Sequence, residues 1–271
     1  MLSGLTIGIK GAGEMASGIA YCLYQSGFSR LFMMETQKPL AVRRLVSFCS
    51  AIEAGKILVE GVTAVKVETA EDIHRTWKEA RIPVIIDARW QTIGRLKPDV
   101  VIDAILAKKN LGTKRGEAPL VIGLGPGFTA GEDVDLLIET ERGHNLGRHI
   151  FSGPAAKDTG IPGNIGGHTL KRVLRAPVDG CFIAEKKICD SVKTGEIIGT
   201  VGHQAVRAEI NGVVRGLIQS GISVSAGLKI GDIDPRNERG YCDSVSDKAR
   251  ALGGSVIMAI LRKFNTNPAG S

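Results

Sequence analysis

Two hydrophobic patterns alternate along the first hundred residues of the chain. Short runs of consecutive apolar residues, such as 83–87 (PVIID) and 99–104 (DVVIDA), are typical of strands buried on both faces of a parallel sheet. Between these runs, apolar residues recur every three or four positions, as on one side of an amphipathic helix. This alternation predicts an α/β fold that opens with a Rossmann-like, doubly wound domain. The expected strands are 5–10, 31–35, 58–59, 62–67, 83–87 and 99–104, and the expected helices are 14–25, 41–53 and 70–81.

The pattern changes after about residue 110, where glycines become frequent and helical spacing fades. Glycine clusters at 123–131 (GLGPGFTAG), 142–147 (RGHNLG) and 159–168 (TGIPGNIGGH) predict loops joined by short strands. The second half of the fold is therefore expected to be mostly β.

A repeat follows the glycine-rich region. Residues 176–201 and 208–233 match at an offset of 32, with Gly180 and Gly212 in equivalent positions. Two such copies predict a small β unit with pseudo-two-fold symmetry. The repeat resembles the lipoyl/biotinyl barrel-sandwich domains, but the hairpin at 202–207 (GHQAVR) has no lysine to carry a prosthetic group. The predicted domains are a Rossmann-like domain (1–110), a glycine-rich β/loop region (111–175), a lipoyl-like barrel-sandwich unit (176–235) and a C-terminal helix with a tail (236–271).

Composition narrows the class of protein. The 271 residues are 43% hydrophobic and 23% charged, as in globular proteins with a proper core. No apolar run approaches the roughly 18 residues of a membrane helix, and the first residues lack the pattern of a secretory signal. Five cysteines without a CxxC pair indicate reduced thiols in the cytoplasm and no metal site. The net charge of +7 is scattered and aromatic residues make up only 4%, so nucleic acid is not an expected partner.

The segment strand–GAGEMA–helix is the strongest motif for ligand binding. Gly11 allows a tight turn, Gly13 allows a pyrophosphate to approach the backbone, and Ala16 allows close packing of helix on strand. Glu35 ends the next expected strand, where a ribose-binding carboxylate belongs. Two objections stay open. The turn can persist for geometry alone, and Glu14 places a negative charge beside the expected pyrophosphate.

A second candidate anion site lies in GLGPGFTAG. The amides around Gly125 and Gly127 are candidates for an anion-binding nest, and Thr129 adds a hydroxyl. Arg142 and His144 would supply charge if the two glycine segments meet. The alternative is a tight structural loop.

Cys242 is the candidate reactive thiol, because exposure near Arg239 or a helix N-terminus would stabilise its thiolate. The alternative is an inert, half-buried thiol. Asp87 and Asp103 end buried strands, so they face a ligand or cap helices. His168 lies in a glycine loop, where a structural or exposed role is more common than catalysis.

The whole set of motifs resembles the YqeB family. That resemblance implies a maturation accessory protein for selenium-dependent molybdenum hydroxylases, with the apo-hydroxylase as partner. It implies no catalytic residues. The cofactors to consider are then a dinucleotide, either NAD(P) or molybdopterin cytosine dinucleotide, or the small anion selenophosphate. The motifs that carry the resemblance are GAGEMASGIA, KPLAVRR, VEG, VIDAILAKKN, GLGPGFTAGEDVDLLIET, RGHNLGR, TGIPGNIGG, RAPVDG, LKIGDIDPR and SDKARALGGSV.

Two other functions stay open. One is an NAD(P)-dependent oxidoreductase, for which His144 or His168 would have to serve a proton relay. The other is a noncatalytic scaffold that docks the hydroxylase through its β unit. The sequence does not decide whether the protein catalyses a reaction. It also leaves the oligomeric state open, and a homo-oligomer is one of the assemblies considered.

Overall fold

The computed structural model describes residues 2–265, which form two compact units. The first unit takes the chain up to Gln37, Phe48–Asp158, and the stretch from Val245 onward. The second unit takes Lys38–Ser47 and Thr159–Ser244. Both units are discontinuous in the chain, whereas the predicted boundaries after residues 110, 175 and 235 divide it into consecutive segments.

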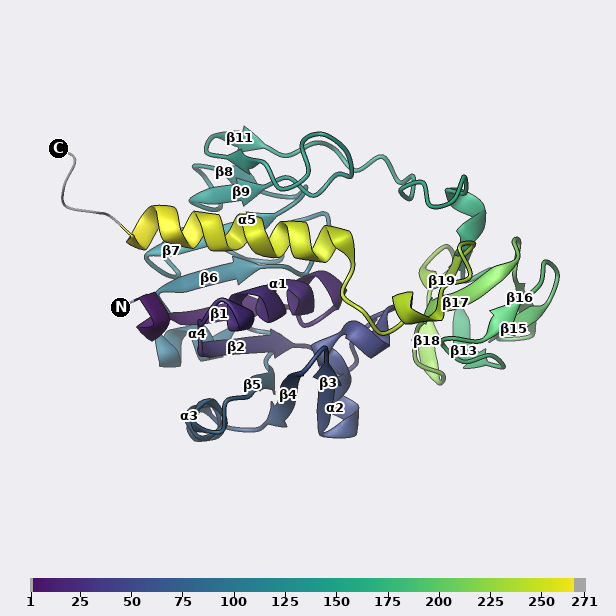
Figure 1. Cartoon of the computed structure of the whole chain (residues 1–271), viewed down its shortest axis with the longest axis horizontal. Coiled ribbons are helices and arrows are strands. Elements are labelled where there is room, and N and C mark those ends of the chain that lie inside the picture. Colours follow the sequence, from purple (N-terminus) through teal and green to yellow (C-terminus); the bar gives the residue numbers. More distant parts are fainter. Residues whose placement is uncertain (1, 266–271) are drawn as a thin grey trace. The chain divides into compact units, whose positions relative to one another are not determined.

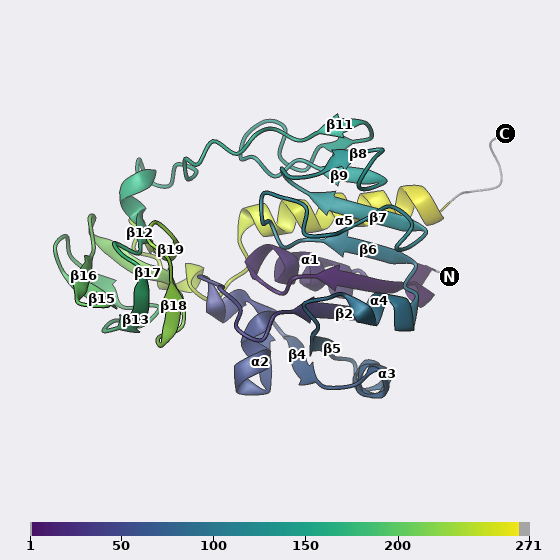
Figure 2. The same ribbon diagram turned by 180° about the vertical axis from the view of Figure 1, so that it is seen from behind.

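The first unit is built on one mixed sheet of nine strands (Figures 1 and 2). Its order is β10-β9-β7-β6-β1-β2-β5-β4-β3. All pairs from β9 to β4 are parallel, and the edge strands β10 and β3 pair antiparallel with their neighbours. The strands are β1 (Thr6–Lys10), β2 (Arg30–Glu35), β3 (Lys56–Val59), β4 (Val62–Val67), β5 (Ile82–Ile86), β6 (Val100–Asp103), β7 (Leu120–Leu124), β9 (Leu136–Ile138) and β10 (His149–Ile150). A separate two-stranded sheet joins β8 (Thr129–Ala130) and β11 (Gly153–Pro154).

Helices cover both faces of the nine-stranded sheet. The helices are α1 (Glu14–Gln25), α2 (Ala51–Ala54), α3 (Ala70–Lys78), α4 (Gln91–Leu96) and α5 (Asp247–Phe264). The short 3-10 turns are η1 (Leu2–Gly4), η2 (Arg44–Val46), η3 (Phe48–Ser50), η4 (Leu170–Arg172) and η5 (Arg239–Tyr241). On the face of α3 and α4, Ile73 and Ile93 share an apolar core with Phe32 and Val101 of the sheet.

Helices α1 and α5 lie side by side on the other face (Figure 1). Small residues permit this approach. A Cβ on Gly18 would lie 2.5 Å from Cβ of Ala249, and a Cβ on Gly253 would lie 2.5 Å from Sγ of Cys22. The last helix of the chain thus completes the core that the first helix begins. None of the helices in residues 2–265 has the length and apolar character needed to cross a membrane.

The second unit consists of two antiparallel four-stranded sheets, β12-β19-β17-β14 and β16-β15-β13-β18. Positions related by the offset of 32 occupy equivalent strands, so β13, β14 and β15 correspond to β17, β18 and β19. Each half contributes its middle strand to the sheet of the other half. The strands are β12 (Val173–Arg175), β13 (Gly180–Ala184), β14 (Ser191–Val192), β15 (Ile197–Val201), β16 (Gln204–Arg207), β17 (Gly212–Leu217), β18 (Ile222–Val224) and β19 (Lys229–Asp234). The apolar side chains of both sheets form one core.

The predicted fold class, a Rossmann-like doubly wound domain followed by a β region with a lipoyl-like barrel-sandwich unit, is wrong. The observed nine-stranded sheet is mixed and continues through Ile150. The fold also contains a two-stranded antiparallel sheet and two four-stranded antiparallel sheets. The prediction ended the first domain at residue 110 because helical spacing fades there, but β7, β9 and β10 extend the same sheet.

The predicted helix at 41–53 is also wrong. Its residues form the short turns η2 and η3 and the single-turn helix α2. The backbone of this segment pairs with β17 instead of forming a helix, since the carbonyl of Val42 accepts a hydrogen bond from the amide of Leu217 at 2.8 Å. The Arg44 guanidinium in turn donates to the carbonyl of Leu217 at 2.9 Å. Pairing with β17 outweighs the helical spacing of the apolar residues.

Candidate functional site at the carboxyl edge of the sheet

The carboxyl ends of the parallel strands meet at one edge of the nine-stranded sheet. Here β1 ends at Lys10, β2 at Glu35, β6 at Asp103 and β9 at Ile138. Loops at this edge of an open α/β sheet are where ligands collect. The site is therefore sought among these loops and the helices that start from them.

The turn after β1 has the geometry that the glycine motif predicts. Gly11 has a φ of +89°, and a Cβ there would lie 3.2 Å from the Cα of Ile105, so both conformation and space require glycine. Gly13 caps the amino end of α1, and no side chain caps it by a hydrogen bond. A Cβ on Gly13 would meet no atom within 4 Å. Ala16 is fully buried, as expected for close packing of helix on strand.

Glu35 lies at the predicted place and reaches back to the turn. Its Oε2 accepts the amide of Ala12 at 2.9 Å, and its Oε1 accepts the amide of Thr36 at 2.8 Å. Oε1 also accepts the hydroxyl of Thr36 at 3.2 Å. A carboxylate has about four acceptor positions, so one acceptor position remains on Oε2. The carboxylate thus orders the turn.

Lys248, in the first turn of α5, is a functional candidate that the sequence interpretation missed. Burial lowers the pKa of Lys248, and the Arg142 guanidinium lowers it further, against the opposing effect of the carboxylates of Glu14, Glu139 and Asp247. A lysine in the first turn opposes the helix dipole, and this was the signal in the sequence. Glu14 of α1 interacts electrostatically with Lys248 and favours its charged form, whereas burial disfavours that form.

A buried polar network lies on the α3–α4 face at the end of β1, and the sequence interpretation missed it too. Lys10 is completely buried, and its Nζ donates to Oγ1 of Thr113 at 2.7 Å and to Oε2 of Glu117 at 2.7 Å. Thr113 donates onward to Oδ2 of Asp103 at 2.6 Å. The Nζ also lies 5.5 Å from the ring centroid of Trp90. The signal in the sequence was a lysine that ends an otherwise apolar strand.

Asp103 and Asp87 have different roles at this edge. Burial raises the pKa of Asp103 and favours its protonated form, against the opposing effects of the Thr113 hydrogen bond and the Lys10 ammonium. Asp87 accepts the amide of Thr92 at 2.7 Å and its hydroxyl at 2.8 Å. Burial acts to raise the pKa of Asp87, but these hydrogen bonds more than compensate and lower it. Asp87 is therefore a cap for α4, one of its two predicted roles.

The second predicted anion site is not formed as expected. The amide of Gly125 donates to the carbonyl of Ile138 at 2.9 Å and is not available to a ligand. A Cβ on Gly127 would lie 2.6 Å from the backbone nitrogen of Lys109, so protein fills that side of the loop. The loop does contact the neighbouring glycine segment, since a Cβ on Gly125 would lie 2.4 Å from Oγ1 of Thr140. The loop is a tight structural connection, the alternative considered from the sequence.

The side chains predicted to line that anion site do not lie together. Arg142 donates to both carboxylate oxygens of Asp247, at 2.7 and 2.9 Å. His144 is exposed. The amide of Thr129 donates to Oδ2 of Asp133 at 2.8 Å, and Thr129 belongs to β8. These three residues do not converge on one position with Gly125 and Gly127.

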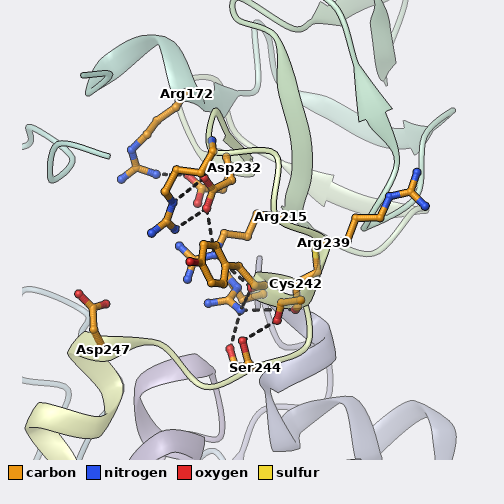
Figure 3. Close-up of polar contacts among 12 residues, drawn as sticks. Arg172, Arg215, Asp232, Arg239, Cys242, Ser244 and Asp247 are labelled. Atoms are coloured by element: carbon orange, nitrogen blue, oxygen red, sulfur yellow. Dashed lines mark hydrogen bonds and ion pairs between the residues drawn. The ribbon is translucent and has the colours of Figure 1, made fainter. Parts of the chain in front are cut away.

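Cys242 belongs to the second unit and lies near Arg239 (Figure 3). Its side chain is 1% exposed. Burial raises the pKa of the Cys242 thiol to about 12, helped by the neighbouring Cys189. An exposed, reactive thiolate at this position is therefore not observed, and the buried thiol considered as its alternative is, because burial disfavours the charged form. His168 pairs through its backbone with Ile165 and has a structural role. Among residues 2–265 no cluster of His, Cys, Asp and Glu suits a metal ion.

Comparison with known proteins gives one relative with substantial identity. The chain is 48% identical over 253 residues to "Uncharacterized protein YqeB" of Escherichia coli (strain K12), which covers 93% of this chain and 47% of that protein. The chain thus spans about half the length of the curated relative that it matches. This similarity supports the predicted resemblance to the YqeB family, and it assigns no activity to the chain. No family model matches the chain.

Solved structures align with the chain only loosely. TcdA (CsdL) aligns at 13% identity with a TM-score of 0.35, over 97% of this chain and 87% of that one. An aspartoacylase family protein from Mesorhizobium loti aligns at 10% identity with a TM-score of 0.23, over 75% of this chain and 55% of that one. A succinylglutamate desuccinylase/aspartoacylase from Rhodobacter sphaeroides gives 11% identity and a TM-score of 0.24, over 85% of each chain. Scores this low carry no argument about function.

Proposed function

We propose that the chain is an accessory protein in the maturation of selenium-dependent molybdenum hydroxylases. In this proposal it binds a phosphorylated ligand at the glycine turn between β1 and α1. The ligand is the molybdopterin cytosine dinucleotide or selenophosphate, and the partner is the apo-hydroxylase. The role in maturation comes from the family resemblance, and the binding site comes from the geometry of the first unit.

One observation carries the binding site: α1 starts at Gly13 without a side-chain cap and with open space in front of that residue. The uncapped amides at the start of a helix, together with the helix dipole, favour an anion. Lys248, in the first turn of α5, interacts electrostatically with Glu14. Glu35 accepts the amide of Ala12 through Oε2, which keeps one acceptor position for a sugar hydroxyl. These features match the pyrophosphate and ribose of a dinucleotide.

The test is a substitution that fills the open space without disturbing the fold. Gly13 has an extended backbone (φ −71°, ψ −174°) that any residue adopts, and a Cβ there meets nothing. Gly13→Leu is therefore expected to keep the melting temperature while abolishing ligand binding. Gly254→Leu in α5 is the matched control, because its Cβ would also meet nothing within 4 Å. Binding is measured by calorimetry with a cytidine dinucleotide, NAD, NADP and selenophosphate.

The result separates the proposal from its rivals. Loss of binding and of hydroxylase maturation in Gly13→Leu alone supports the proposal. Binding of NAD or NADP with turnover of a small substrate would replace it with an oxidoreductase, a reading favoured by the position of Glu35. Capture of the hydroxylase that is unchanged in Gly13→Leu, with no ligand bound by the parent chain, would leave a noncatalytic scaffold.

A further inference from the structure

Two cysteines of the second unit, far apart in the chain, share the same backbone neighbours. The amide of Cys189 donates to the carbonyl of Val214 at 2.9 Å, and Sγ of Cys242 lies 3.8 Å from that same oxygen. Sγ of Cys189 lies 4.0 Å from the carbonyl oxygen of Arg239, which also accepts the amide of Cys242 at 2.9 Å. Figure 3 shows Cys242 beside Arg239. Cys189 is also near enough to raise the pKa of the Cys242 thiol, after the larger effect of burial.

We propose that Cys189 and Cys242 are a dithiol that closes reversibly to a disulfide when the protein meets a low-molecular-weight disulfide. This modification site is independent of the ligand site proposed above, which uses only residues of the first unit. The bond would join the connection between β13 and β14 to the segment that follows η5.

Exposure sets the order of the reaction. Cys189 is partly exposed and Cys242 is buried, so the small disulfide reaches Cys189 first. The Cys189 thiolate attacks one sulfur, a mixed disulfide forms, and the first small thiolate leaves and takes up a proton. The Cys242 sulfur then attacks Cys189 Sγ, the second small thiolate leaves, and the proton of Cys242 goes to it. The protein loses two electrons and two protons, and the small disulfide gains them as two thiols.

The surroundings of Cys242 suit this resolving role. The negative charge of a Cys189 thiolate contributes to the raised pKa of Cys242, and this contribution disappears once Cys189 is capped as a mixed disulfide. The guanidinium of Arg43 acts in the opposite direction and stabilises a Cys242 thiolate. Its Nη2 donates to the carbonyl of Tyr241 at 2.7 Å and so holds the charge next to this segment. Burial remains the largest cause of the raised pKa of Cys242, so capping Cys189 restores only part of its thiolate character.

The test treats the full chain with oxidised glutathione and maps thiols by mass spectrometry without reduction. The expected product is one crosslinked peptide pair containing Cys189 and Cys242, with two equivalents of glutathione released and reversal by dithiothreitol. In Cys242→Ser, Cys189 is expected to stop at the glutathione adduct. In Cys189→Ser, Cys242 is expected to remain free. Cys181→Ser is the matched control, because Cys181 is an exposed thiol of the same unit and its loss leaves the crosslink intact.

The outcomes decide the proposal even if a variant of the buried Cys242 folds poorly, since the parent chain and Cys189→Ser give the same answer. A stable glutathione adduct on Cys189 in the parent chain, without crosslink, would overturn it. So would a crosslink that survives Cys189→Ser, because another thiol would then be the partner. Failure of ligand binding at Gly13 has no bearing on either result.

Discussion

Replacing Lys10 by Met tests whether the buried network at the end of β1 holds the loop after β6 to the sheet. Methionine keeps the length and volume of the side chain but removes the ammonium. Thr113 then loses the hydrogen bond it accepts at 2.7 Å, and Glu117 loses an ion pair at 2.7 Å. Breaking a buried pair costs about 3–5 kcal/mol when the remaining charge stays buried.

The structure indicates that the free-energy cost of Lys10→Met lies below that range. The Glu117 side chain is 20% exposed and can recover water, and Asp103 can take up a proton. We therefore expect Lys10→Met to lower the free energy of unfolding by about 2–3 kcal/mol at pH 8. The control is Lys78→Met, which removes an exposed lysine of the same unit. It is expected to change the free energy of unfolding by less than about 0.5 kcal/mol.

The loss is expected to depend on pH. Burial raises the pKa of Asp103 above its ordinary value, and Lys10 counteracts this effect. A carboxyl group with a raised pKa in the folded state contributes stability below its unfolded pKa and loses that contribution as the pH rises through the folded pKa. Without Lys10 the folded pKa rises further, so the substitution is expected to cost less at pH 5 than at pH 8.

The assay is urea unfolding followed by tryptophan fluorescence at both pH values. The ring of Trp90 lies near Lys10 and reports on the network directly. A loss below about 0.5 kcal/mol, or an equal loss at pH 5 and pH 8, would refute the reasoning. The first outcome would mean that the ammonium makes no net contribution, and the second that Asp103 does not sense it.

Three further substitutions test the packing of each unit. Gly18→Leu places a side chain where a Cβ already lies 2.5 Å from Cβ of Ala249, so it is expected to cost at least about 1–3 kcal/mol in urea unfolding; an unchanged midpoint would contradict the close α1–α5 contact. Arg172→Met removes the closer of two salt bridges to the buried Asp232 and leaves Lys229 Nζ at 3.5 Å from its Oδ1. It is expected to lower stability by about 1–3 kcal/mol, seen as early loss of amide protection in residues 159–244 by hydrogen exchange; uniform protection would argue against it. Thr69→Ala removes the capping box of α3 and is expected to cost about 1 kcal/mol by thermal unfolding, whereas a change within about 0.3 kcal/mol would mean that the cap is not formed.

The glycine turn could be predicted from sequence because its requirements are local. Gly11 needs a positive φ and Gly13 opens a helix, and both follow from residue type and from position between a strand and a helix. Glu35 was placed by the same local rule, at the end of the next strand. The internal repeat was equally visible, because equivalent strands need similar residues. The predicted extent of the first sheet was wrong, because the short strands expected in the glycine-rich region carry no local signal that says which sheet they join.

The sequence did not predict the roles of Lys10, Lys248 and the Cys189–Cys242 pair, for a different reason. Each depends on partners distant in the chain, such as Thr113 for Lys10 and Glu14 for Lys248. Nothing in the local pattern of any of them says which group lies opposite. The same holds for Cys242, for which the sequence left both an exposed and a half-buried thiol open and whose surroundings bury it.

By itself, the sequence determined where most strands and helices form, where backbone turns need glycine, and that the second unit repeats. Those features depend on periodicity and on the conformational freedom of single residues, which act over a few positions. Only the tertiary structure decided that α5 completes the first core, that residues 38–47 pair with a strand of the second unit, and which charges and thiols are buried together. Burial and pairing arise from contacts between distant segments, because solvent exclusion and the energy of a charge depend on everything around the group.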